Sequence, residues 1–231
     1  MTYGEWYALY VDLYKRKLKP KSRESHARLH ALLMPTIGGL LLEQISPDDI
    51  QRALLDVETR AGSRQAQLAY ALMHAVLRRA CRSRRLTFNP VEAVDKPEHE
   101  ARKGRAVSGE DWLRLRPIID EDVCFALMAY AGLRRGEVLG LQRGDVDLQE
   151  GMIHVRRQRL RVDGALVTSA PKSEAGVRDV PISAELLPIL SAACRLQHPS
   201  ARLCACAPET LAHRWRRAQL QEGIMQPDKV Q

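Results

Sequence analysis

The sequence predicts a mainly α-helical protein with a small antiparallel β-sheet, and three observations support that fold class. Apolar residues recur at helical spacing through most of residues 1–86 and 108–130. Between 146 and 182 the pattern changes to the alternation typical of β-strands, with a hairpin-turn signal at Asp163–Gly164. A stretch of mixed charge and little periodicity lies between the two parts. We therefore expect two domains, 1–95 and 108–231, joined by a linker at 96–107.

The composition favours a globular protein that binds a polyanion. Hydrophobic residues make up 45% of the 231 positions, which is too many for a disordered chain. The formal net charge is +8, and it divides into about +4 on each side of residue 100. Such a spread suits two basic surfaces, although a merely soluble basic protein is the alternative. No apolar run of membrane-spanning length and no signal-peptide pattern is seen.

Five scattered cysteines predict free thiols in a reducing cytosol rather than a disulfide framework. Two of them lie with two histidines in the segment His198–His213, which raises the alternative of a zinc site. The C-x-C spacing of Cys204 and Cys206 is unlike that of ordinary zinc fingers. We therefore expect no metal.

In the first half, four side chains are placed to cap the N-termini of helices. The expected caps are Thr2, Ser22, Ser46 and Ser63. The helix after Ser22 should end near Met34, because Pro35 disfavours helical geometry in the residue before it. The aromatic residues of the first helix are expected to pack in a core.

Two clusters of cations in this half are candidates for binding phosphate groups. The first is Lys19, Lys21 and Arg23, where a basic loop leads into a helix N-terminus. The second is Arg78, Arg79, Arg82 and Arg85, at the end of the helix that begins near Ser63. The alternatives are a solvated charge run for the first cluster and a complement to the helix dipole for the second.

The second half begins with a helix capped by Ser108 and a second helix from about 120 to 130. The alternation of apolar and polar residues over 153–156 then indicates a first strand, and 165–170 and 177–182 read as the next two. Ser183 is expected to cap a further helix. Between the helices and the strands lies the segment AGLRRGEVLGL, 131–141. It places Arg134, Arg135 and Glu137 among apolar residues. Burying a guanidinium is costly unless it is paired, so either Glu137 neutralises an arginine or an arginine awaits an anion.

Taken in this order, the motifs resemble those of the tyrosine recombinase (phage integrase) family over nearly the whole chain. The segment Gly132–Glu137 is similar to the family's G-x-R-x-x-E box, and PKSEAGVRDVPI resembles the strand-turn-strand that carries its catalytic lysine. The resemblance implies a helical, SAM-like core-binding domain at 1–95. It also implies the N-terminal part of the catalytic domain at 108–231.

The resemblance also implies the chemistry. Arg134 matches the arginine that holds the scissile phosphate, and Glu137 matches the acidic residue that supports it. Lys172 matches the lysine that protonates the departing 5′-oxygen, whereas Arg135 should face outward. The family's reaction needs neither metal nor nucleotide cofactor and proceeds through a 3′-phosphotyrosyl bond. The implied partner is double-stranded DNA, bound by a homotetramer or mixed tetramer in the cytoplasm of a bacterial or phage-infected cell, in association with the nucleoid and not with a membrane.

The sequence departs from the family pattern after this point. All six tyrosines precede Arg134, whereas the family's nucleophile follows that arginine. The second catalytic box, H-x-L-R-H, has only a partial match at His213 and Arg216. We therefore expect an integrase cut off within its catalytic domain and inactive alone, with apolar surface exposed on the second domain. The alternative function is that of a non-catalytic DNA-binding protein or a dominant-negative integrase fragment.

Overall fold

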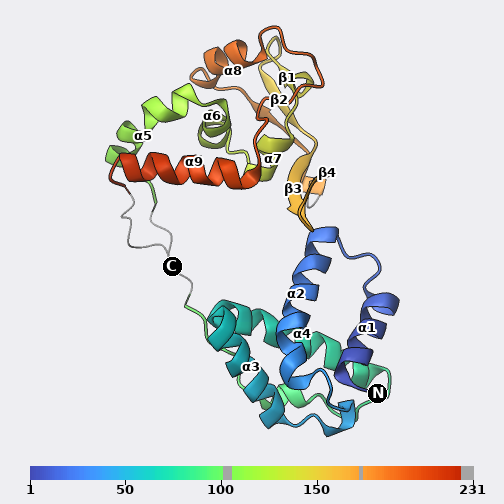
Figure 1. Cartoon of the computed structure of the whole chain (residues 1–231). Coiled ribbons are helices and arrows are strands. Elements are labelled where there is room, and N and C mark those ends of the chain that lie inside the picture. The colour runs from blue at the N-terminus through green and yellow to red at the C-terminus, as the bar shows by residue number, and fades with distance from the viewer. Residues whose placement is uncertain (101–105, 172–173, 225–231) are drawn as a thin grey trace. The chain divides into compact units, whose positions relative to one another are not determined.

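The computed structural model describes residues 1–100, 106–171 and 174–224. The chain divides into two compact units, Met1–Lys103 and Gly104–Gln231 (Figure 1). The mainly helical fold class with small antiparallel sheets is confirmed. Within the described ranges, no helix combines the length and the apolar character needed to cross a membrane.

The first unit is a helical bundle built around its longest helix. Its elements are α1 (Tyr3–Tyr14), α2 (Pro20–Ile37), η1 (Leu42–Gln44), α3 (Pro47–Ala61), α4 (Ser63–Arg82) and η2 (Pro90–Ala93). Helix α4 contacts each of the other three α-helices. The expected core packing of the α1 aromatics is confirmed for Tyr3, Trp6, Tyr7 and Tyr10, which are buried, but not for Tyr14, which is exposed. The Trp6 indole N–H also donates to the Val76 carbonyl at 3.0 Å.

Two of the predicted caps form reciprocal capping boxes. The Thr2 hydroxyl accepts from the Glu5 amide, while the Glu5 carboxylate accepts from the Thr2 amide. Ser46 and Asp49 make the same exchange at the start of α3. At α4 the cap is Gly62, whose φ of 87° suits glycine, and Ser63 is the first helical residue.

The predicted limits of the second helix are wrong at both ends. Helix α2 begins at Pro20, two residues before Ser22. Proline is favoured at the first helical position because the backbone N–H that it lacks would have no acceptor within the helix there. The helix also continues through Pro35 to Ile37. Pro35 and Ala31 are both exposed, so the carbonyl that loses its amide partner can bind water instead.

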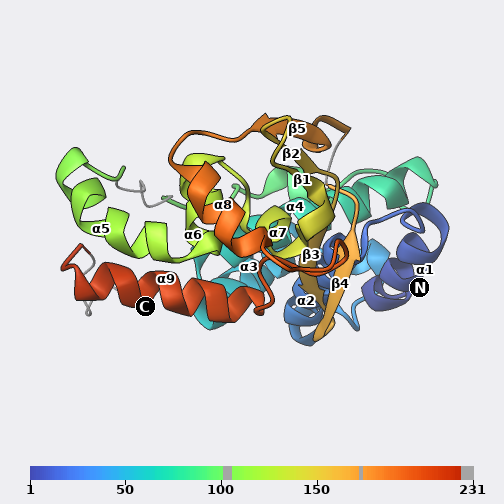
Figure 2. The same ribbon diagram turned by 90° about the horizontal axis from the view of Figure 1, so that it is seen from above.

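In the described part of the second unit, five helices pack against two small antiparallel sheets. Its helices are α5 (Gly109–Glu121), α6 (Val123–Tyr130), α7 (Arg135–Gly140), α8 (Leu186–Cys194) and α9 (Pro208–Gln221), with 3₁₀ turns η3 (Arg143–Asp145) and η4 (Glu174–Gly176). Ser108 caps α5 as predicted, in a capping box with Asp111. Helix α9 lies beside α5 in both views of the unit (Figures 1 and 2).

The strands form two sheets rather than the single sheet that the sequence predicts. One contains β1 (Val146–Asp147), β2 (Met152–Val155) and β5 (Arg178–Pro181), in the order β1-β2-β5. The other is the hairpin of β3 (Gln158–Val162) and β4 (Ala165–Ser169). Its turn is the predicted Asp163–Gly164, where both residues have positive φ, as a type I′ turn requires. The hairpin packs against α7, where an added Cβ at Gly140 would lie 3.0 Å from the Arg157 carbonyl oxygen.

The expectation of free thiols is wrong for two of the five cysteines. Cys124, at the start of α6, forms a disulfide with Cys204, which precedes α9 and lies 80 residues away in sequence. Their Cα atoms are 5.9 Å apart, within the usual range for a disulfide. The disulfide links the start of α6 to the segment before α9. The ion pair of Asp122 and Arg214 joins the same two parts of the second unit.

Candidate functional site

The centre of the candidate site is a buried carboxylate held between two arginines. Gly132, with a φ of 61°, makes the turn after α6, and Arg134 then becomes the N-cap of α7. Glu137, at the third position of that helix, turns its side chain back to accept the Arg134 amide at 2.9 Å. Its other oxygen accepts from the Arg134 guanidinium, also at 2.9 Å. Helix α7 thus fixes the backbone and the side chain of Arg134 through a single acidic residue.

The second arginine of this site is Arg178, on strand β5. Its two terminal nitrogens donate to the two oxygens of Glu137 at 2.9 and 3.1 Å. This is the bidentate geometry in which arginine and carboxylate interact most strongly. The sequence places Arg178 on the face of the predicted sheet and does not link it to Glu137, which lies 41 residues away. The only sequence signal was a cation within the last predicted strand.

Burial differs sharply among these three groups, and it decides what each can do. The side chain of Glu137 is 3% exposed and that of Arg178 is 29% exposed, whereas that of Arg134 is 76% exposed. Burial raises the pKa of Glu137, but the hydrogen bonds and charges of the two arginines outweigh it and hold that pKa below its ordinary value. Glu137 also raises the pKa of Arg178. The carboxylate is therefore ionised at neutral pH, and the three groups carry a net charge of about +1.

The structure shows the first of the two possibilities considered for the segment 131–141. Glu137 neutralises an arginine, but the one that it pairs with most completely is Arg178. Arg134 keeps most of its guanidinium in contact with solvent, where an anion can reach it. Arg135 is exposed, as expected.

Lys172 lies outside the described residues, so its predicted role remains a prediction. The described residues on each side belong to the same part of the second unit. Before Lys172, the Ala170 carbonyl accepts from the Gln158 side chain on β3. After it, η4 leads directly into Arg178, which contacts Glu137.

The candidate second box, His213 and Arg216, lies on α9. His213 is exposed and Arg216 is partly buried. Within the described ranges, neither side chain hydrogen-bonds to Arg134, Glu137 or Arg178. No cluster of three metal-binding side chains is found among the same residues, and Cys204 is bonded to Cys124.

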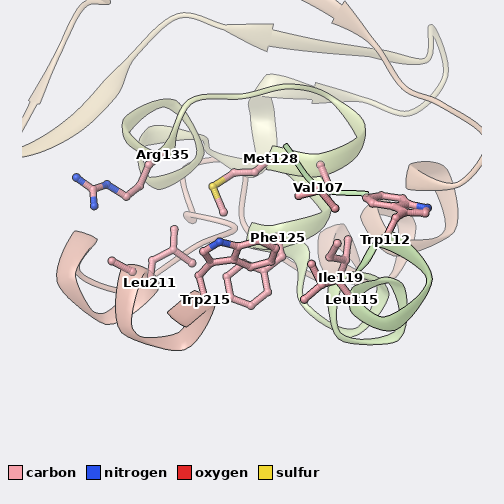
Figure 3. Close-up of a pocket in the computed structure, with 11 residues that line it drawn as sticks. Val107, Trp112, Leu115, Ile119, Phe125, Met128, Arg135, Leu211 and Trp215 are labelled. Atoms are coloured by element: carbon pink, nitrogen blue, oxygen red, sulfur yellow. The ribbon is translucent and has the colours of Figure 1, made fainter. Parts of the chain in front are cut away.

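An apolar pocket of about 500 Å³ opens on the second unit (Figure 3). The rings of Phe125 and Trp215 meet edge to face within it, at a centroid distance of 5.2 Å. Leu115 and Ile119 of α5 and Leu211 of α9 line it too, while the guanidinium of Arg135 points away from it. The lining of this pocket is mainly apolar.

The basic clusters of the first unit differ in how their side chains are held. Lys21 pairs with Glu24 at 2.8 Å, and Arg23 donates to the Arg16 carbonyl at 3.2 Å. Lys19 is the N-cap of α2. At the end of α4, by contrast, cations lie over aromatic rings: Arg79 is 3.7 Å from the ring centre of Tyr14, and Arg85 is 5.3 Å from that of Trp6. Within the described ranges, no ion pair joins Arg78, Arg79, Arg82 or Arg85 to a carboxylate.

Comparison with known proteins agrees with this architecture. The putative prophage phiRv2 integrase of Mycobacterium tuberculosis is 27% identical over 184 residues, which are 77% of this chain and 48% of that protein. The prophage integrase IntR of Escherichia coli is 31% identical over 112 residues, which are 48% of this chain and 26% of that protein. The chain thus spans about half, or less, of the length of the curated relatives that it matches. No protein-family model matches it.

Solved structures with the same fold are DNA-bound recombinases. The Tn1549 transposon integrase in complex with circular intermediate DNA has a TM-score of 0.79 at 15% identity, covering 100% of this chain and 81% of that one. A lambda integrase dimer bound to a core site has a TM-score of 0.72 at 17% identity, covering 98% and 83%. A lambda integrase tetramer bound to a Holliday junction has a TM-score of 0.73 at 16% identity, covering 98% and 68%.

The helical bundle and the small sheets give this chain the fold of these integrases. Its curated relatives are named as prophage integrases, and the chain resembles the tyrosine recombinase (phage integrase) family.

Proposed function

We propose that the chain binds double-stranded DNA and contributes to site-specific recombination, with Arg134 contacting the phosphate at which strands are exchanged. The observation that carries this proposal is the state of Arg134, which is fixed at its base by Glu137 and 76% exposed at its tip. Attack on a phosphodiester builds negative charge on the non-bridging oxygens. A fixed guanidinium stabilises that charge without having to reorganise.

We assign the other residues of the site by the same chemistry. Glu137 orients Arg134, and Lys172 protonates the departing 5′-oxygen when a tyrosine attacks the phosphorus atom and forms the 3′-phosphotyrosyl bond. Residues 1–95 serve as the core-binding domain and 108–231 as part of the catalytic domain, with 96–107 between them. Lys19, Lys21, Arg23, Arg78, Arg79, Arg82 and Arg85 contact the DNA backbone. Assembly on DNA as a homotetramer or a mixed tetramer completes the proposal.

Residues 1–231 contain no tyrosine after Arg134. We therefore propose that they bind DNA without cleaving it, and that the nucleophile comes from elsewhere. A non-catalytic role, as a DNA-binding protein or a dominant-negative partner in a mixed tetramer, is the second candidate, and the same observation favours it.

The test combines binding with trapping of a covalent product. Affinity for a labelled duplex is measured by fluorescence anisotropy from about 50 to 200 mM salt, over which several phosphate contacts produce a steep decline. Arg134→Ala should reduce the slope of log K against log salt by about 0.9, which corresponds to one phosphate contact. Arg135→Ala serves as the control from the same helix. An affinity that does not change with salt would refute the proposal.

Denaturing electrophoresis with a nicked duplex then tests cleavage. We expect a shifted complex under native conditions and no protein–DNA adduct after denaturation. An adduct formed by residues 1–231 would show that they contain a nucleophile after all, and peptide mapping would locate it.

A further inference from the structure

At the end of α4, the structure contains a basic pocket whose central cation is held by a tyrosine. The pocket has a volume of about 330 Å³. Its lining includes the cations Lys15, Arg78, Arg79 and Arg82, and among the described residues no carboxylate lines it. Clustered cations without a counter-ion repel one another, so such a pocket favours an anion.

Arg79 is the most constrained of these cations. Its guanidinium lies 3.7 Å from the centre of the Tyr14 ring, and the residue is only partly exposed, whereas Arg78 and Arg82 are exposed. Its Nε atom is buried and has no hydrogen-bond partner in the described part of the chain. Stacking engages the face of the guanidinium plane and leaves donors at its edge available to an acceptor.

Tyr14 faces this cluster with its hydroxyl as well as its ring. The Arg79 guanidinium and the Ser83 hydroxyl lower the pKa of Tyr14, against a smaller opposing effect of burial. Lys15, the residue after Tyr14, lies 5.4 Å from the ring centre of Tyr10. The C-terminal part of α1 thus supplies rings that support cations from both α1 and α4.

We propose that Tyr14 and Arg79 form a preorganised site for one backbone phosphate of duplex DNA, with Lys15, Arg78 and Arg82 at its rim. This inference rests on the proposed DNA binding and specifies where one phosphate is held. Arg85, which lies over Trp6, continues the basic surface beyond the pocket. A row of cations matches the repeating charge of a polyanion better than it matches a single small anion.

A double-mutant cycle on the full chain tests the site, with duplex affinity and its salt dependence as readouts. Arg79→Gln should weaken binding about tenfold and reduce the salt slope by about 0.9. Tyr14→Leu, which keeps apolar bulk but removes the ring, should weaken binding about two- to fivefold. In the Arg79→Gln background, Tyr14→Leu should weaken duplex binding by less than about twofold, because the ring no longer has a guanidinium to hold in place.

Two matched variants serve as controls. Tyr14→Phe keeps the ring and should bind within about twofold of the wild type. Arg64→Gln removes an exposed arginine at the opposite end of α4 and should have a much smaller effect than Arg79→Gln. Tyr14 is 39% exposed, so its replacement should leave the fold intact, and circular dichroism checks this.

The outcomes separate the site from the proposed function. A wild-type affinity that does not change with salt would overturn DNA binding itself. A steep wild-type dependence that Arg79→Gln leaves unaltered would overturn only the site, as would equal losses from Tyr14→Leu in both backgrounds. Inorganic phosphate at constant ionic strength provides the last comparison. If micromolar phosphate alone raised the melting temperature of the wild type but not of Arg79→Gln, the site would belong to free phosphate rather than to DNA.

Discussion

Replacing Arg178 should destabilise the second unit far more than replacing Arg134, although both arginines bind the same carboxylate. Arg178→Gln removes two hydrogen bonds to Glu137, whose side chain is 3% exposed. Losing one partner of a buried ion pair costs about 3–5 kcal/mol. In the Arg178→Gln variant, the amide and the guanidinium of Arg134 still donate to Glu137. We therefore expect a loss in the free energy of unfolding at the lower end of this range, about 3 kcal/mol.

Arg134→Gln gives a contrasting result for the same partner. It removes one hydrogen bond from a side chain that is 76% exposed, and solvent screens that interaction. The Arg134 amide continues to donate to Glu137, and Arg178 continues to neutralise it. The expected loss is about 0.5–1 kcal/mol. Arg135→Gln, on the same helix but outside the cluster, should change stability by less than about 0.5 kcal/mol.

Urea denaturation followed by tryptophan fluorescence measures these differences. The protein has three tryptophans, and only Trp112 and Trp215 belong to the second unit. A Trp6→Phe background therefore restricts the signal to that unit. At an m-value of about 1–3 kcal/mol/M, the Arg178→Gln variant should lose roughly 1–3 M in its unfolding midpoint. Equal losses for Arg178→Gln and Arg134→Gln, or a larger loss for the latter, would refute this account of the cluster.

The pH dependence provides a second check on the same cluster. The pKa of Glu137 lies below its ordinary value of 4.5 in the folded state. Its stabilising contribution is therefore present above pH 4.5 and is lost as the pH falls through the lowered pKa. The stability difference between the wild type and Glu137→Gln should accordingly shrink on acidification from neutral pH. A difference that grew on acidification would show that the carboxyl is protonated in the fold.

Three further predictions concern other parts of the molecule. Reducing the Cys124–Cys204 disulfide, or changing both cysteines to serine, should lower the stability of the second unit by about 2–4 kcal/mol, whereas Cys81→Ser should have little effect when the melting curves are compared. Burial lowers the pKa of His30, which stacks on Tyr7, so the stability that it contributes is present above about pH 6.5 and lost below it. His30→Gln should therefore flatten the pH dependence of unfolding of the first unit, and an unchanged dependence would contradict this. Gly140→Ala should lower the free energy of unfolding by about 1–3 kcal/mol, because the added Cβ would lie 3.0 Å from the backbone of Gln158 on β3. At Gly39 an added Cβ has no atom within 4 Å, so Gly39→Ala should leave the thermal denaturation curve nearly unchanged.

The parts of the fold that could be predicted from sequence are those fixed by neighbouring residues. Capping boxes at Thr2 and Ser46 involve partners three residues away, and the Asp163–Gly164 turn depends on the φ preferences of two residues. The continuation of α2 through Pro35 does not follow from local preferences, because it depends on which side of the helix faces water.

The parts that could not be predicted join residues that are distant in sequence. The family box located Glu137, but only the fold brings Arg178 to it across 41 residues. The same is true of Cys124 and Cys204, and of β5, which pairs with β2 rather than with the strand before it. A sequence pattern identifies the residue types that a site needs, whereas partners contributed by another strand depend on the topology.

The cation of each proposed phosphate site is held in place by a neighbour, but the neighbours differ in charge. In the second unit a buried carboxylate holds Arg134 and also pairs with Arg178, so the cluster of three groups retains only about one positive charge. In the first unit an aromatic ring holds Arg79 and subtracts no charge. Under the proposed function, the first arrangement suits a single phosphate that must be positioned for reaction, because the carboxylate of Glu137 fixes the direction of the Arg134 guanidinium. The second suits attraction of the DNA backbone, because the full charge of Arg79 is retained.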